Sequence, residues 1–450
     1  MSLPFLLICT LFLGGAVSKP LEQLAKQGRF SLLQVAVPRK VAWSAARDIQ
    51  RTYLKYGVPV PTHINAALAP PNGTGQSTVP VRPVKGDVEY LINVTVGNHV
   101  LALDMDTGSS DLWVFSTLQP EDQRTNRPVA RVYDTSGVTA KKLEGHTWQI
   151  RYGDMSGANG QVYLDKVGVG SVFFDQQAVE AASSVSRTFS RDAANDGLLG
   201  LAFSKLNTIK PTAQNTWFDN VKSQLAEPVF TSALRRRAIG SYDFGYIDKS
   251  KYTGEIAYTN VTGTRGFWTF APTGYSVGDG PVVNATMNAI ADTGTSLWYL
   301  PRAVTDGYWA KVPGAQYNSL QAGWMFPCGS KLPDMSIVIS GQKVVVSGVN
   351  MEYQQISSQQ CYGGIQRDTG MPFSIFGDVF LKGVFAVFES REGQTPRLGF
   401  AQQSPSLASP EGQVPQNSSE PNPFDDNALG GIGDEEPNPF GSPFAAGKKA

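Results

Sequence analysis

The sequence predicts an all-β fold made of two homologous lobes. The 450-residue chain contains 46 glycines and 29 prolines and only 17% charged residues, a composition typical of a turn-rich β protein. One motif also occurs twice in similar apolar surroundings: residues 100–115 read VLALDMDTGSSDLWVF and residues 289–300 read AIADTGTSLWYL. Because the chain is longer than one compact core usually organises, we expect two lobes with additional terminal segments.

The repeated motif centres on two aspartates, Asp106 and Asp292. Each follows an apolar strand and precedes a threonine, a glycine and a hydroxyl residue. A carboxylate in this position loses hydration worth on the order of several kcal/mol unless hydrogen bonds surround it, so a structural role alone does not explain it. A second glycine motif follows at similar intervals, at Gly200 (200 − 106 = 94) and Gly377 (377 − 292 = 85). The similar intervals indicate that the two lobes are homologous.

The ends of the chain differ from its centre. Residues 1–18 form an apolar run that ends in small residues, which predicts a signal peptide. Residues 19–86 carry ten basic and two acidic residues (10 − 2 = +8), and the tail repeats Glu-Pro-Asn-Pro-Phe in a composition typical of disorder. The predicted division is a signal peptide at 1–18, a basic inhibitory propeptide at 19–80 with its boundary between 70 and 86, an N-terminal lobe at 81–248, a C-terminal lobe at 249–402, and a disordered tail at 403–450.

Charge and hydropathy exclude some classes of partner. The formal net charge is zero and the central region has no Lys/Arg stripe, so nucleic acid is not an expected partner. No stretch after the signal peptide is long and apolar enough to span a bilayer, and the C-terminus lacks an apolar anchor signal. The basic leader on a mildly acidic core instead suggests a removable segment that covers an anionic groove.

Alternating apolar runs and turn residues predict the elements in order. Strands are expected at 89–96 and 100–105 around the turn Gly97-Asn98, and at 147–151 and 160–167 around a polar tip. Short helices are expected at 215–224 and 301–311, and further strands at 336–347, 384–389 and 397–401. Within the leader, residues 45–56 predict a helix with Ala45, Ile49 and Tyr53 on one face.

The two Asp-Thr-Gly motifs, the segment Tyr152-Gly153-Asp154 and the paired glycine motifs resemble those of the pepsin-like aspartic endopeptidases. The resemblance is to the secreted fungal branch that includes penicillopepsin and aspergillopepsin, and it runs in order from about residue 87 to about residue 400. It implies a bilobal pepsin-like fold, with a few short helices and a substrate cleft between the lobes. It also implies a monomeric peptidase that acts on extended peptides and proteins without a cofactor.

Peptide hydrolysis requires a nucleophile stronger than neutral water and a proton for the leaving amine. Two carboxyl groups that share one proton supply both, because one can accept a proton from water while the other polarises the carbonyl. Aspartic proteases are the standard example of such a pair. Asp106 and Asp292 are therefore the expected catalytic residues, at acidic pH.

The resemblance implies roles for the residues around the two aspartates. Thr107 and Thr293 bind across the lobes, Gly108 and Gly294 let the backbone approach the carboxylates, and Ser109 and Thr295 orient them. A flap closes over the substrate, with Tyr152 hydrogen-bonded to Trp113. The expected substrate-binding residues are Tyr152, Gly153, Asp154, Ser156, Gly108, Gly294 and Thr295. Asp154 in such a flap predicts acceptance of Lys, as well as large apolar residues, before the scissile bond.

In the leader, Lys55 and Tyr56 match the pair that occupies the active site of zymogens of this family, so the propeptide is expected to inhibit its own chain. Cys9 leaves with the signal peptide, and Cys328 and Cys361 can close one loop. The resemblance implies that they pair. Secretion is the expected destination, with the vacuole as the alternative. Glycosylation sequons begin at Asn72, Asn93, Asn260, Asn284 and Asn417.

Other chemistries fit the sequence less well. A zinc site lacks ligand spacing among the cysteines and histidines, a calcium loop at 104–115 has Gly and Phe at ligand positions, and no nucleophile-elbow motif accompanies a histidine. Paired carboxylates also serve glycosidases, but no run of exposed aromatics favours a sugar substrate. The main alternative is an inactive pepsin-fold binding protein. Such a protein is expected to lose one Asp-Thr-Gly motif or the flap tyrosine, and this chain keeps all three.

Overall fold

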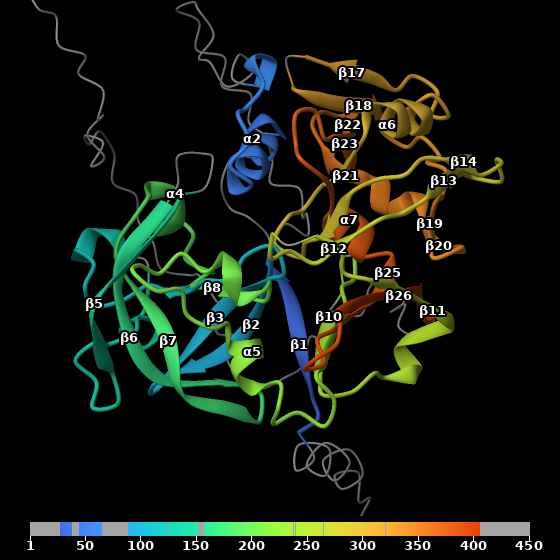
Figure 1. Cartoon of the computed structure of the whole chain (residues 1–450). Helices are drawn as coiled ribbons and strands as arrows, with labels where there is room; N and C mark the ends of the chain where they lie inside the picture. The colour runs from blue at the N-terminus through green and yellow to red at the C-terminus, as the bar shows by residue number, and fades with distance from the viewer. Residues whose placement is uncertain are drawn as a thin grey trace, which may run out of the picture. The chain divides into compact units, whose positions relative to one another are not determined.

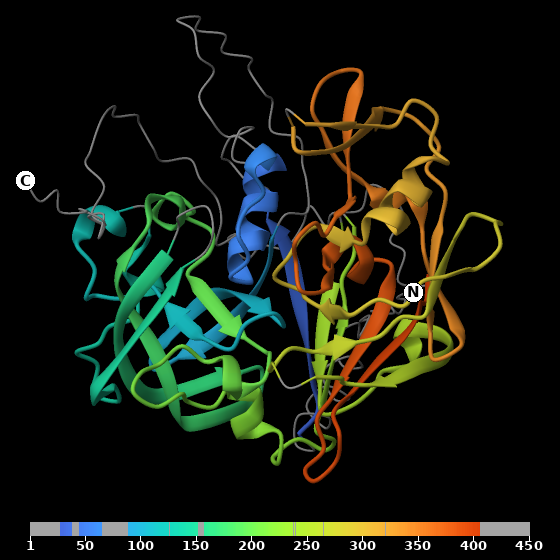
Figure 2. The same cartoon turned by 45° about the horizontal axis from the view of Figure 1, so that its top comes forward.

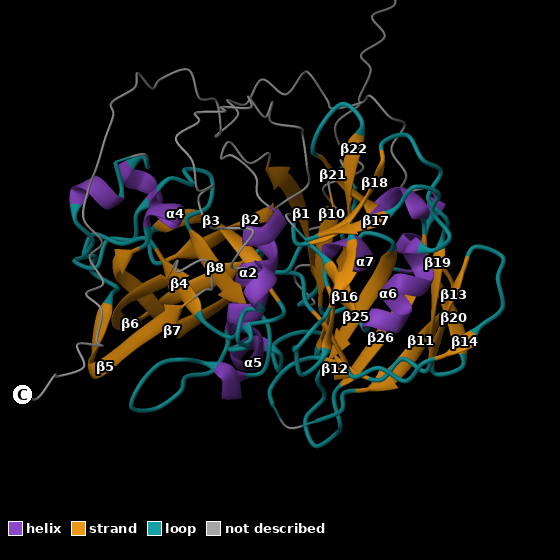
Figure 3. Cartoon of the chain, turned by 90° about the horizontal axis from the view of Figure 1, so that it is seen from above, coloured by secondary structure: helices purple, strands orange, loops and turns teal. Residues whose placement is uncertain are grey.

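The computed structural model describes residues 28–37, 45–64, 89–125, 127–151, 157–236, 238, 240–263, 265–319 and 321–405. The predicted signal peptide, the flap residues 152–156 and the tail beyond 405 lie outside these residues. Most of the described chain forms strands, and its helices are short (Figures 1 and 3). The prediction of an all-β fold is confirmed.

In the part of the chain that the structure describes, thirteen strands form one continuous sheet, in the order β11-β26-β25-β9-β10-β1-β2-β3-β8-β4-β7-β6-β5. These strands are β1 (Phe30–Val37), β2 (Glu89–Val96), β3 (His99–Asp106), β4 (Leu112–Val114), β5 (Lys141–Arg151), β6 (Gly157–Val169), β7 (Val172–Val185), β8 (Gly197–Gly200), β9 (Val229–Ala233), β10 (Gly240–Phe244), β11 (Tyr252–Asn260), β25 (Val384–Glu389) and β26 (Arg397–Gln403). The expected lobe boundary near residue 248 falls between β10 and β11.

Strand β1 comes from the basic leader, where no strand was predicted. It pairs antiparallel with β10 over Phe30–Gln34 and with β2 over Val35–Val37, and Figures 1 and 2 show it between the strands of the two halves. Phe30 is buried and its ring stacks on Phe244 with centroids 5.0 Å apart. The leader therefore contributes a strand to the main sheet.

The internal duplication is visible in the strand pairing. β3, which ends at Asp106, runs parallel to β8; β8 pairs antiparallel with β4, and β4 runs parallel to β7. The same parallel, antiparallel, parallel pattern links β15 (Ala289–Ala291), β24 (Ser374–Phe376), β16 (Trp298–Leu300) and β23 (Ile365–Arg367). Each aspartate thus leaves a buried strand that lies beside the strand of the second glycine motif.

The remaining elements surround this framework. The other strands are β12 (Thr269–Phe270), β13 (Gly274–Val277), β14 (Val283–Asn284), β17 (Gln316–Asn318), β18 (Gly323–Pro327), β19 (Met335–Ile339), β20 (Gln342–Val346), β21 (Glu352–Gln355) and β22 (Gln360–Gly363). The helices are α2 (Ala45–Lys55), α4 (Arg187–Ser190), α5 (Trp217–Val221), α6 (Arg302–Trp309) and α7 (Asp378–Leu381), with 3-10 turns at Glu121–Gln123, Val129–Arg131, Ser204–Leu206, Lys249–Lys251 and Gly348–Met351. No helix in the described ranges is long and apolar enough to cross a membrane.

Helix α2 is the predicted leader helix, and it packs on the second half of the chain. Ile49 and Tyr53 of the expected apolar face are buried, together with Ala46, while the side chain of Ala45 is outside the description. They form a cluster with residues of the second Asp-Thr-Gly region, including Leu297. This packing places the C-terminal end of α2 at the two aspartates.

Candidate active site

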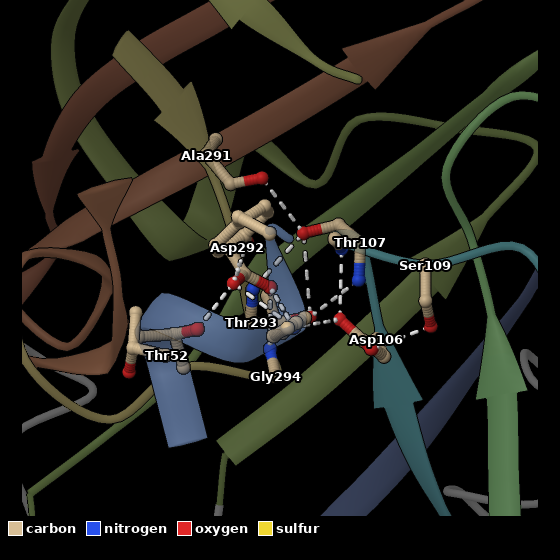
Figure 4. Close-up of polar contacts among 12 residues, drawn as sticks. Thr52, Asp106, Thr107, Ser109, Ala291, Asp292, Thr293 and Gly294 are labelled. Carbon is tan, nitrogen blue, oxygen red and sulfur yellow. Dashed lines mark hydrogen bonds and ion pairs between the residues drawn. The ribbon is translucent and has the colours of Figure 1, made fainter. Parts of the chain in front are cut away.

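The two Asp-Thr-Gly turns meet, and their aspartates share one buried site (Figure 4). Asp106 is 1% exposed and Asp292 is 0% exposed. Lys55 Nζ lies 2.9 Å from the Oδ1 atom of each aspartate, so one ammonium group contacts both carboxyl groups. The duplication thus brings together two carboxyl groups that are far apart in the chain.

The glycines of the two turns make this approach possible. A Cβ added to Gly108 would lie 2.3 Å from Asp292 Oδ1, and one added to Gly294 would lie 2.3 Å from Asp106 Oδ1. Any side chain at either position would displace the carboxyl group of the other turn. The exclusion is reciprocal, as expected for two copies of one motif.

Each aspartate is oriented by groups of its own turn. Ser109 Oγ donates to Asp106 Oδ2 (2.5 Å) and the amide of Gly108 donates to Asp106 Oδ1 (2.8 Å). In the second turn, Thr295 Oγ1 donates to Asp292 Oδ2 and the amide of Gly294 donates to Asp292 Oδ1 (3.0 Å). These donors compensate part of the hydration that the carboxyl groups lose on burial.

Two threonines fasten the turns to each other. Thr107 Oγ1 donates to the carbonyl of Ala291 (2.9 Å), and Thr293 Oγ1 donates to the carbonyl of Met105 (2.6 Å). Each of these carbonyls belongs to the strand that leads to the opposite aspartate. The position of one carboxyl group therefore depends on the backbone of the other half.

The two carboxyl groups have different proton affinities. Burial raises the pKa of Asp106, and the neighbouring Asp292 raises it further against the opposing effect of Lys55. Burial also acts to raise the pKa of Asp292, but the charge of Lys55 and the hydrogen bonds from Asp106, Thr295 and Tyr56 outweigh it, so this pKa lies below its usual range. With Lys55 in place, Asp292 is the more acidic member of the pair and Asp106 the less acidic one.

Lys55 and Tyr56, at the end of α2, occupy this site. Tyr56 OH donates to Asp292 Oδ2, and its ring packs edge-on against Phe373 (4.9 Å between centroids) and Phe267 (5.5 Å). Burial alone would lower the pKa of Lys55, but the two aspartates raise it above its ordinary value, so Lys55 stays charged. The sequence did not identify Phe267 and Phe373 as site residues: Phe267 lies outside the motifs, and Phe373 begins the second glycine motif, which indicated only an apolar strand before Gly377.

The predicted flap cannot be compared with the structure, since Tyr152, Gly153, Asp154 and Ser156 lie outside the described residues. Trp113, its expected partner, is buried at 2% exposure. Its ring stacks on the ring of Trp148, with 6.2 Å between the ring centroids. It also packs against the ring of Phe189, with 5.0 Å between the centroids. The hydrogen bond between Tyr152 and Trp113 stays a prediction.

The other predicted positions lie away from the two turns. Cys328 and Cys361 form a disulfide with 5.0 Å between their Cα atoms. Asn93, Asn260 and Asn284 are exposed, whereas Asn72 and Asn417 are outside the described residues. Within the described part of the chain, no group of three or more His, Cys, Asp or Glu side chains is placed to hold a metal ion.

Comparison with known proteins gives one consistent result. The model of the family described as eukaryotic aspartyl protease matches residues 89–403. Aspergillopepsin-1 of Aspergillus oryzae is 48% identical over 375 residues, which cover 83% of this chain and 93% of the relative. Penicillopepsin-3 of Penicillium janthinellum is 45% identical over 393 residues, which cover 87% of this chain and 96% of the relative. The crystal structure of the aspartic proteinase from Irpex lacteus has the same fold, with a TM-score of 0.58 and 24% identity over 71% of this chain and 96% of that one. The chain belongs to the eukaryotic aspartyl protease family.

Proposed function

We propose that this chain is the zymogen of a secreted endopeptidase that hydrolyses peptide bonds at acidic pH with a water activated between Asp106 and Asp292. The observation that carries the proposal is that Lys55 Nζ lies 2.9 Å from both carboxyl groups, so the same space can hold a small polar reactant between them. The hydroxyls of Ser109 and Thr295 hold the outer oxygens and fix the orientation of the pair.

The reaction follows from the shared proton. The ionised carboxylate accepts a proton from the water as its oxygen attacks the peptide carbonyl carbon, and the protonated partner donates its proton to the carbonyl oxygen. Proton transfer to the amide nitrogen then accompanies cleavage of the carbon–nitrogen bond. Because one group must be ionised and the other protonated, activity requires a pH between the two apparent pKa values of the pair.

The leader acts as an intramolecular inhibitor in this proposal. Lys55 neutralises the pair and Tyr56 fills the adjacent position between Phe267 and Phe373. The charge of Lys55 lowers the pKa of Asp292, so that pKa rises when α2 leaves and the open form binds more protons. Falling pH therefore favours release of the leader, by the usual linkage between proton binding and a conformational equilibrium.

Substrate preference rests on the resemblance of the flap. We propose that the pocket before the scissile bond accepts large apolar residues and also Lys, because the carboxylate of Asp154 can offset the lysine charge. Asp154→Ala should reduce kcat/KM for cleavage after Lys and leave cleavage after Phe or Leu. Equal losses on matched Lys and Phe peptides would contradict this role.

Secretion is supported by the disulfide between Cys328 and Cys361, since disulfides persist in oxidising compartments. Exposed Asn93, Asn260 and Asn284 are compatible with glycosylation along that route. N-terminal sequencing and mass measurement of protein from the culture medium would give the processing site and the glycan occupancy. Retention of all the protein inside the vacuole would favour the alternative destination.

The peptidase proposal is tested with purified chain incubated at about pH 4, with casein or haemoglobin as the substrate. We expect digestion that a statine-type inhibitor blocks, and Asp106→Asn or Asp292→Asn should each lower it by about 100-fold or more. Asp134→Asn, which changes an aspartate outside the site whose Oδ1 accepts from Ser136, is the control and should retain activity. Absence of digestion by processed wild-type protein would favour a catalytically inactive binding protein.

A further inference from the structure

A second pair of buried carboxyl groups lies just beyond the first Asp-Thr-Gly turn. Asp111 is 1% exposed, and Glu180 of β7 is 0% exposed. Both side chains accept from the same nitrogen atom, Asn207 Nδ2. Asp111 Oδ1 also accepts from the amide of Thr208 (2.7 Å) and from Asn207 Nδ2 (3.1 Å), and Asn207 Nδ2 lies 3.0 Å from Glu180 Oε1. Four residues from three segments thus form one buried polar cluster.

Among the residues that the structure describes, no ion pair reaches Asp111 or Glu180. The cations of this half of the chain bind other carboxylates: Arg127 and Arg131 pair with Asp196, and Lys222 pairs with Asp219. The strand partners of Glu180 are Trp113 of β4 and Val162 of β6, neither of which is charged. The acids of the neighbouring elements are engaged elsewhere: Asp165 accepts from Tyr133 OH, and Asp219 pairs with Lys222.

Such a pair must retain a proton. Two ionised carboxylates in contact, with no cation and little water, would repel each other in a medium of low polarity. Glu180 Oε2 is buried and has no hydrogen-bond partner among the described residues, so this oxygen can hold a proton without giving up a hydrogen bond that it accepts. Burial raises the pKa of Glu180 well above its usual range, the charge of Asp111 raises it further, and burial also raises the pKa of Asp111.

The cluster is connected to the active-site turn through the backbone. The carbonyl of Asp111 accepts from the amide of Gly200 (2.9 Å), and the carbonyl of Asp106 accepts from the amide of Leu201 (2.8 Å). The carbonyl of Ser109, whose hydroxyl orients Asp106, accepts from the amide of Ala202 (2.9 Å). Residues 106–111 therefore lie along residues 200–202, and the side chain of Asp111 anchors the end of this stretch.

We propose that Glu180 is a positioning residue whose proton holds Asp111 and, through Asp111, the turn that orients Asp106. Loss of this proton as pH rises limits the working enzyme to acidic pH. This inference rests on the proposed role of Asp106. In this proposal the proton of Glu180 lies between the two carboxyl groups. When Glu180 ionises, that proton is lost and two negative charges remain beside one buried amide nitrogen. The end of the turn should then separate from β7, and the enzyme should lose activity by local unfolding, independently of the protonation of the catalytic pair.

The direction of the pH effect follows from linkage. The pKa of Glu180 is raised in the folded state, so above the ordinary range of a glutamate the folded chain binds more protons than the unfolded one. Its contribution to stability is complete below that range and decreases as pH rises. The folding equilibrium constant should fall by up to about tenfold per pH unit for this one proton.

The decisive variant is Glu180→Gln, which keeps the shape and a hydrogen-bond donor but cannot ionise. Processed enzyme is incubated across a range of pH and then assayed at acidic pH. We expect Glu180→Gln to match the wild-type kcat/KM at acidic pH and to retain activity to a pH at least about one unit higher. Glu180→Ala, which lacks the donor, should be less stable than wild type even at acidic pH. Loss of activity by Glu180→Gln at the wild-type pH would overturn the proposal.

Unfolding measurements separate this inference from the peptidase proposal. Tryptophan fluorescence in the Asp106→Asn background requires no activity and excludes self-digestion. The midpoint pH should rise in Glu180→Gln and in Asp111→Asn. It should not rise in Asp134→Asn, because hydrogen bonds from Ser136 hold the pKa of Asp134 below its usual range. If neither Glu180→Gln nor Asp111→Asn folds, the test is made on the Asp106→Asn chain that keeps Glu180. Its unfolding temperature must fall as pH rises above the usual glutamate range, and an unfolding temperature that does not change with pH overturns the proposal.

Discussion

Thr107 and Thr293 exchange hydrogen bonds: the amide of each donates to the hydroxyl oxygen of the other, at 3.0 Å in both directions. The two residues are nearly inaccessible, at 0% and 4% exposure. Since each hydroxyl also donates to the opposite strand, the turns form one symmetric unit. The relative position of the two aspartates is therefore set by buried polar contacts between the halves.

Replacing Thr107 with Val should destabilise this unit. The substitution leaves the amide of Thr293 and the carbonyl of Ala291 without their partners, at about 1–3 kcal/mol for each buried group. Denaturant unfolding should therefore show a loss of about 2–6 kcal/mol. Thr117→Val is the control, because its exposed hydroxyl contacts only Thr135 among the described residues. An equal loss in both variants would mean that the contacts between the turns add nothing.

Lys55→Met should change the pH dependence of activation. Without the lysine charge the pKa of Asp292 is no longer held down, and removing one partner of a buried ion pair costs about 3–5 kcal/mol. Zymogen carrying this change should be processed faster near neutral pH and show a flatter pH profile, followed as conversion on denaturing gels. Lys222→Met, which removes a more exposed pair with Asp219, should behave as wild type. A Lys55→Met zymogen with the wild-type profile would contradict this role of Lys55.

Gly294→Ala should abolish activity through contact rather than through unfolding. The new Cβ would lie 2.3 Å from Asp106 Oδ1 and displace that carboxyl group from the pair. We expect kcat to fall by about 100-fold or more, as for loss of one acid–base group. Gly329→Ala is the comparison: it strains the backbone at φ +81, but its Cβ meets nothing within 4 Å. That variant should lose about 1–2 kcal/mol of stability and remain active.

Removing the disulfide should lower stability without changing the chemistry. The bond joins Cys328 to Cys361 across a separation of 33 residues, for which the chain-entropy model gives about 3–4 kcal/mol. The double variant Cys328→Ser, Cys361→Ser should unfold at a lower denaturant concentration and keep its kcat/KM at low temperature. If kcat/KM also falls at a temperature where the double variant is folded, the loop takes part in substrate binding.

The local sequence pattern was sufficient to predict several strands of the fold and the two catalytic aspartate candidates. The predicted strands 89–96 and 384–389 have the bounds of β2 and β25, and the duplicated motif led to the pair of aspartates. The predicted helix 215–224 is shorter, because the side chain of Thr216 accepts from the amide of Asp219 and begins α5 at Trp217. Features that depend on distant partners could not be predicted. Strand β1 pairs with β10, about 200 residues further along the chain. The raised pKa of Glu180 depends on its burial and on Asp111, which is distant in the sequence.

The position of β1 makes cleavage and departure of the leader two separate events. A cut at any bond after residue 64 and before β2 severs the chain, but it leaves the hydrogen bonds of β1 to β10 and β2 and the contacts of Lys55 unchanged. The severed piece is then a separate ligand that these contacts hold, with a dissociation constant of its own. By mass action, freshly cut enzyme should gain activity on dilution, and added leader should suppress it again.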